Sequence, residues 1–169
     1  MLILLRVIHV LFGVFWVGTA MFNAAFLIPT VRALGPAGGA VMQEIAQKRK
    51  LPIYFFISGI LTVLSGIGLF WHDSAGFTNE FMRSRGGMTF GFGGLLAIIT
   101  LFLGIFVITP AAIRASKLGA TIAAGGRPPT PEQGAEMQRL QAKLGSMGWV
   151  AAVLLTGTTI AMAVARYVS

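Results

Sequence analysis

Four long apolar segments constrain the fold of this chain more than any other feature of its sequence. None of them has a Lys, Asp or Glu in its middle, and they cover residues 7–28, 51–71, 88–113 and 147–168. About 20 apolar residues suffice for a helix to cross about 30 Å of hydrocarbon, and a single segment in lipid must satisfy its own backbone hydrogen bonds. The sequence therefore predicts an all-α fold, a four-transmembrane-helix bundle, formed as a single integral membrane domain over residues 1–169 in a lipid bilayer.

The distribution of charge predicts how this bundle is oriented. The net charge is +8, but no basic stripe interleaved with aromatic residues accompanies it, so we expect no nucleic-acid partner. Nine of the 13 cations lie between spans one and two or between spans three and four. Cytoplasmic loops are enriched in Lys and Arg, which predicts a multi-pass protein with both basic loops in the cytoplasm and both termini outside. The first apolar run is too long for a signal-peptide core, so we expect it to remain as a span.

Both basic loops also contain helical patterns. Thr130, Pro131 and Gln133 form a capping-box sequence, and residues 41–50 give a similar helical pattern that ends just before Pro52. We expect these segments to extend spans four and two at the headgroups, in preference to serving as docking sites for a partner.

A short internal repeat indicates two related halves. Residues 26–29 end in Ile-Pro and precede Arg32, while residues 106–110 end in Ile-Thr-Pro and precede Arg114. Spans one and three therefore end alike, which predicts two pseudo-repeated helical hairpins related by an axis along the membrane normal.

The two histidines are the strongest candidates for a cofactor site. His9 lies near the outer end of span one, and His72 closes the outer end of span two, so the antiparallel spans place both imidazoles on one side. His9 shares a helix face with Gly13 and Trp16, and we expect these small and large residues to leave a slot for a flat macrocycle. Imidazole is a common axial ligand of haem iron, so we predict one b-type haem or related tetrapyrrole, with His9 as principal and His72 as second ligand. The position of the second hairpin that matches His9 is Phe90, so we predict at most one such site.

Two other functions compete with this prediction. Small residues on every span favour close helix packing, so the chain is alternatively a cofactor-free accessory subunit of a larger respiratory or photosynthetic membrane complex. The histidines together with Met82 and Met88 also suit copper handling at the external face. No cysteine is present, and no paired carboxylates or Ser/His/Asp arrangement is available, so we expect a non-catalytic, redox-accessory protein more than an enzyme.

Residues 6–18, Arg-Val-Ile-His-Val-Leu-Phe-Gly-Val-Phe-Trp-Val-Gly, resemble the opening span of a group of small bacterial membrane proteins. This group comprises predicted integral membrane proteins of unknown function and is related to the membrane domain of copper-resistance protein D. Residues 32–35, 61–66 and 128–133 resemble the unknown-function proteins too. The resemblance implies four membrane helices in a bacterial cytoplasmic (inner) membrane and a histidine in the first helix, here His9. A haem-containing protoporphyrinogen oxidase of the wider group likewise has a first-span histidine, but its other characteristic basic residue has no match in this chain.

Overall fold

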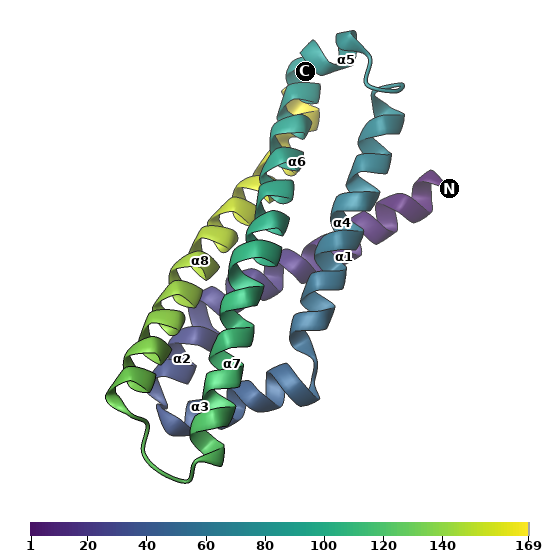
Figure 1. Cartoon of the computed structure of the whole chain (residues 1–169). Helices are drawn as coiled ribbons and strands as arrows, with labels where there is room; N and C mark the ends of the chain where they lie inside the picture. Colours follow the sequence, from purple (N-terminus) through teal and green to yellow (C-terminus); the bar gives the residue numbers. More distant parts are fainter. Residues whose placement is uncertain (169) are drawn as a thin grey trace.

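A computed structural model describes residues 1–168, apart from the side chains of Pro36 and Asn79. All regular structure in this range is helical, and four continuous helical segments are long and apolar enough to cross a membrane (Figure 1). These segments are Leu2–Ala33, Leu51–Asp73, Arg85–Ala124 and Pro131–Tyr167. The predicted four-helix bundle is confirmed, and the chain is a membrane-embedded protein by the length and hydropathy of these helices.

The four segments form two helical hairpins. In the first, α1 (Leu2–Phe22) packs against α4 (Leu51–Asp73), and in the second, α6 (Arg85–Leu103) packs against α8 (Pro131–Val164). Contacts of α1 with α8 and of α4 with α6 join the hairpins, and α1 runs obliquely to the other long helices (Figure 1).

The bundle has two chemically different ends. The terminal end carries both chain termini and the 74–84 connection, which contains the short helix α5 (Asn79–Arg83). There Arg6 and Asp73 approach to 3.8 Å, and a Cβ on Gly86 would lie 3.0 Å from the carbonyl oxygen of Ala165. The basic end carries the 34–50 and 125–130 connections and with them the nine cations of the two basic loops.

Each hairpin's first span contains one wide helical turn at the repeated motif. The π-helical turn η1 (Asn23–Leu27) leads into α2 (Ile28–Ala33), and η3 (Gly104–Ile108) leads into α7 (Thr109–Ala124). Pro29 and Pro110 each occupy the second position of the helix that follows. A proline inside a helix lacks an N–H and crowds the carbonyl four residues before it, and an i→i+5 turn relieves that crowding. The predicted repeat is therefore present in the backbone itself.

The helices of the basic loops differ from each other. The predicted capping box is confirmed, because Thr130 accepts from the N–H of Gln133 at 3.3 Å while the Gln133 side chain accepts from the N–H of Thr130 at 3.0 Å. Residues 131–146 extend span four as α8 without a break, as expected. The first loop instead forms α3 (Pro36–Gln43) and η2 (Glu44–Lys48), which do not extend span two: Lys50 adopts φ 55°, a left-handed conformation that ends the helical path before α4.

Candidate functional site

His9 lies on the face of α1 that packs against α4. Its Nδ1 atom is 2.9 Å from the backbone carbonyl oxygen of Thr62. A carbonyl oxygen only accepts hydrogen bonds, so Nδ1 must carry the proton that it donates. In the neutral imidazole this leaves the lone pair on Nε2 for another partner.

Gly66 provides the space in which the His9 ring sits. A Cβ atom at this position would lie 2.8 Å from Cε1 of His9, closer than real Cβ atoms approach other atoms, and 3.1 Å from Nδ1, which is a tight contact. The same Cβ would be 3.9 Å from Nε2. The edge of the ring that carries Nδ1 is therefore pressed onto α4, and Nε2 lies farther from Gly66.

Three buried hydroxyl groups on α4 continue this contact toward the basic end. Ser65 lies 3.4 Å from His9 Nδ1 and donates to the carbonyl of Leu61, Thr62 donates to the carbonyl of Ser58, and Ser58 donates to the carbonyl of Phe55. Serine and threonine in membrane helices satisfy their donors in this way without water. The α1–α4 interface is thus polar, yet its hydroxyl groups all have partners.

Gly13 and Trp16 also face α4, and the structure places them in direct contact with it. A Cβ on Gly13 would be 3.5 Å from Cγ2 of Thr62, and the buried indole of Trp16 lies against Gly59 and edge-on to Phe55. The helices therefore meet along the face on which we predicted a slot. The role of Gly13 and Trp16 toward a macrocycle stays a prediction, and their observed role is to hold α1 against α4 below His9.

His72 lies at the terminal end, as predicted, but in a different environment from His9. Its side chain is exposed, and its Nδ1 is 3.3 Å from a carboxylate oxygen of Asp73, which also pairs with Arg6. Ser65, which touches His9, is seven residues before His72, or about 10 Å along the helix at 1.5 Å per residue. His72 is thus part of an interfacial charge cluster, whereas His9 is half-buried on the face of α1 that packs against α4.

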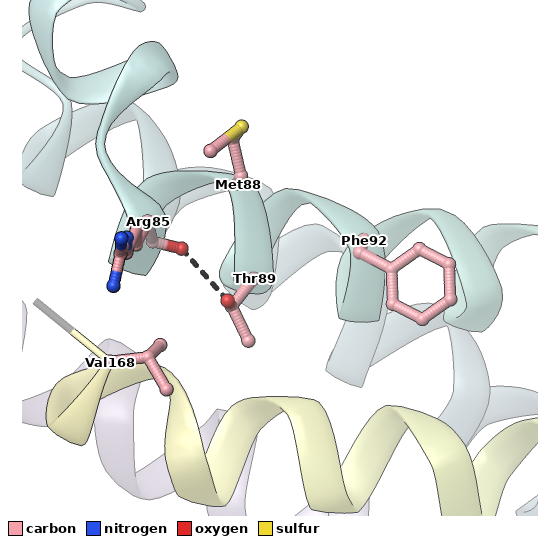
Figure 2. Close-up of a pocket in the computed structure, with 5 residues that line it drawn as sticks. All are labelled: Arg85, Met88, Thr89, Phe92 and Val168. Atoms are coloured by element: carbon pink, nitrogen blue, oxygen red, sulfur yellow. Dashed lines mark hydrogen bonds between the residues drawn. The ribbon is translucent and has the colours of Figure 1, made fainter.

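The methionines of the copper alternative belong to α5 and α6 and not to the helices α1 and α4 that form the His9 contact. Met88 lines a shallow depression of about 450 Å³ together with Arg85, Thr89, Phe92 and Val168 (Figure 2). The Thr89 hydroxyl donates to the carbonyl of Arg85 at 2.8 Å, so it is already partnered. Within residues 1–168 no three His, Cys, Asp or Glu side chains gather around one point, and copper handling stays a prediction.

Sequence reasoning missed three features of this region. It treated Gly66 only as a packing residue, and it gave no sign of the Thr62 carbonyl, because that contact depends on how α1 and α4 are rotated. It also placed Asn23 merely beside the small residues, whereas the structure buries its Oδ1 atom without a hydrogen-bond partner at the start of η1. No family model, curated protein or solved structure matches this chain.

Proposed function

We propose that this chain is a small redox-accessory membrane protein that binds one b-type haem, or a related tetrapyrrole, through His9. The observation that carries the proposal is the hydrogen bond from His9 Nδ1 to the Thr62 carbonyl. Histidines that ligate metals usually donate their other ring N–H to a carbonyl or carboxylate, which fixes the tautomer and raises the basicity of the ligating nitrogen. This donor set fits a tetrapyrrole metal that would be held through Nε2 of His9.

The chain's own residues would hold and tune such a ligand. Thr62 fixes the ring orientation through its carbonyl, Ser65 stands 3.4 Å from the same nitrogen, and Gly66 leaves room for the ring edge. A bound haem supplies one-electron chemistry, whose potential depends on the axial ligand, its hydrogen bonds and its burial.

The distribution of charge supports an orientation for this site. Nine of 13 cations belong to the basic end, so we propose that this end faces the bacterial cytoplasm and that both termini are external. His9 then lies in the outer half of the cytoplasmic membrane, where an external redox partner has access to it.

A visible absorption spectrum of protein purified in mild detergent from haem-replete cells tests the proposal. We expect a Soret band that His9→Ala abolishes and that His72→Ala, the matched control, retains. Gly66→Ala crowds the ring and should lower the haem content without abolishing expression. A wild-type protein that purifies folded and without a chromophore would overturn the proposal.

One observation favours the accessory-subunit alternative. The most apolar stretch of Leu2–Ala33 has a far smaller buried share than those of the other three spans. A span so little covered by its own chain has faces free for a helix of a larger complex. Co-purification of stoichiometric membrane subunits with a colourless protein would support this alternative, and metal analysis of the same sample tests copper handling.

A further inference from the structure

An apolar groove runs along the outside of the bundle between α1 and α8. It has a volume of about 400 Å³. Met21 of α1 and Ala25 of η1 form one side, while Trp149, Val153 and Ile160 of α8 form much of the other. All five side chains are exposed, so the groove opens toward the surroundings of the bundle.

The lining offers apolar contact and little else. Its only side-chain hydroxyl belongs to Thr156, which donates to the carbonyl of Ala152 at 2.8 Å. Between Trp149 and Ile160 the groove extends about 16 Å along α8, at 1.5 Å per residue. This length matches one leaflet, or half of about 30 Å of hydrocarbon.

A cation lies beyond the end of the groove that faces the basic end. One turn before Trp149, the guanidinium of Arg32 rests against Gly145 and donates to the carbonyl of Gln141. Between this point and the groove, Ile28 packs against Gly148, where a Cβ would lie 3.7 Å away. Arg32 is exposed and takes part in none of the ion pairs of residues 1–168, so most of its five donors remain for an anion.

We propose that this groove binds one acyl chain of an anionic phospholipid whose phosphate is held by Arg32. The apolar length takes the chain, and the guanidinium at the headgroup level takes the phosphate, an anion that arginine recognises with paired hydrogen bonds. The two features together select a lipid with a negative headgroup in the leaflet at the basic end. This site is independent of His9, which lies toward the other end of α1.

The second hairpin provides the substitutions that test the site. Counted from the prolines, Phe106 stands where the first hairpin has Ala25, so Ala25→Phe fills the groove with the residue of the other half. Arg32→Gln removes the charge. The matched controls are Arg114→Gln, at the arginine four residues after Pro110, and Ala112→Phe, at an exposed alanine of α7.

Native mass spectrometry of the full chain in detergent, titrated with phosphatidylglycerol or phosphatidylcholine, measures the binding. We expect the wild type to bind one phosphatidylglycerol per chain. Arg32→Gln and Ala25→Phe should each bind it about tenfold more weakly, because the first removes charge-assisted hydrogen bonds to the phosphate and the second removes the buried contact of the acyl chain. Both control variants should bind phosphatidylglycerol with an affinity within about twofold of the wild-type value.

Three results would overturn the proposal. Equal retention of both lipids would show that Arg32 selects no headgroup. An equal loss of phosphatidylglycerol binding in Arg114→Gln would show that the lipid is attracted to the positive charge of the basic end as a whole and not to Arg32. A dimer that dissociates in Ala25→Phe would show that a second copy of the chain occupies the groove.

Discussion

The two hairpins share a backbone plan but differ in the chemistry of their interfaces. Both have a π-helical turn two residues before a proline in the first span. The α1–α4 interface contains His9 and three buried hydroxyl groups, whereas the second hairpin buries Ala97, Leu155 and Ala161 and one hydroxyl group, that of Thr100. The buried indole of Trp16 belongs to the same core cluster as Ala97 and Leu155. Ala97 is the position that matches Trp16, and Phe90 matches His9. One scaffold thus supports a simple packing hairpin and a hairpin with a polarised histidine.

The largest expected loss of stability comes from replacing Trp16 of the first hairpin with alanine, the residue at the matching position of the second hairpin. Trp16→Ala removes a side chain that is 2% exposed and packs on Gly59. We expect a loss of about 4 kcal/mol in the free energy of unfolding, as for other buried aromatic truncations. Denaturing-detergent titration followed by circular dichroism measures it, and a loss below about 1 kcal/mol would mean that the interface collapses to fill the space.

A substitution in the second hairpin tests whether its small residues matter as much. A Cβ on Gly93 would lie 3.0 Å from Cβ of Ala161 and 3.4 Å from the carbonyl oxygen of Thr158. Gly93→Leu should therefore push α6 from α8 and cost about 3 kcal/mol. A Cβ on the adjacent Gly94 would meet no packing neighbour within 4 Å among residues 1–168. Gly94→Leu is thus the matched control and should leave the unfolding midpoint unchanged or higher.

Asn23 of the first hairpin tests the free-energy cost of a buried polar atom without a hydrogen-bond partner, the one such side-chain atom in the described part of the chain. Its Oδ1 atom is buried without a partner, while the matching residue of the second hairpin is Gly104. Asn23→Leu removes this unsatisfied oxygen and should raise the free energy of unfolding by about 1.5 kcal/mol. A decrease measured by the same titration would indicate that the amide has a partner in the membrane.

The smallest expected changes in stability concern the first turns of α4 and α8, the second helix of each hairpin. The helix α8 starts with the Thr130 capping box, whereas α4 starts after Lys50 without a side-chain cap. Thr130→Ala should cost about 1 kcal/mol, visible as faster amide hydrogen exchange over residues 131–136. Exchange at the start of α4 should not change.

The same cap gives a weak dependence on pH. A hydrogen bond from its own backbone N–H, and a lesser one from Thr130, lower the pKa of the exposed Glu132 carboxyl from 4.5. Because the pKa of Glu132 is lower in the folded than in the unfolded state, its ionised form stabilises the helix start at pH values above the unfolded-state pKa. This stabilisation is lost as the pH falls through the folded-state pKa. Acidification below pH 4.5 should therefore lower the protection of the amides of residues 131–136, measured against their intrinsic exchange rate at each pH, in the wild type but not in Glu132→Gln.

Local signals explain how much of this could be predicted. Hydrophobic length gave all four spans, and the capping box gave the start of α8, because both depend on neighbouring residues alone. The third span was predicted too short at residues 114–124, where polar side chains conceal a helix that continues past the apolar core. The His9–Thr62 contact was not predictable, since it needs the rotation of α1 about its axis. Neither were the wide turns, which proline permits but does not require.

The wide turns also determine which neighbouring helix each half of a span contacts. A π-helical turn holds one residue more than the α-helix it replaces, and one residue corresponds to a rotation of about 100°. Upstream of η1 the first span presents His9 to α4, and downstream it presents Arg32 to α8. Loss of a single residue within η1 would swing the guanidinium away from Gly145 while leaving the imidazole in place. A one-codon deletion there would thus separate Arg32 from α8 at the basic end and leave the contact of His9 with α4 undisturbed.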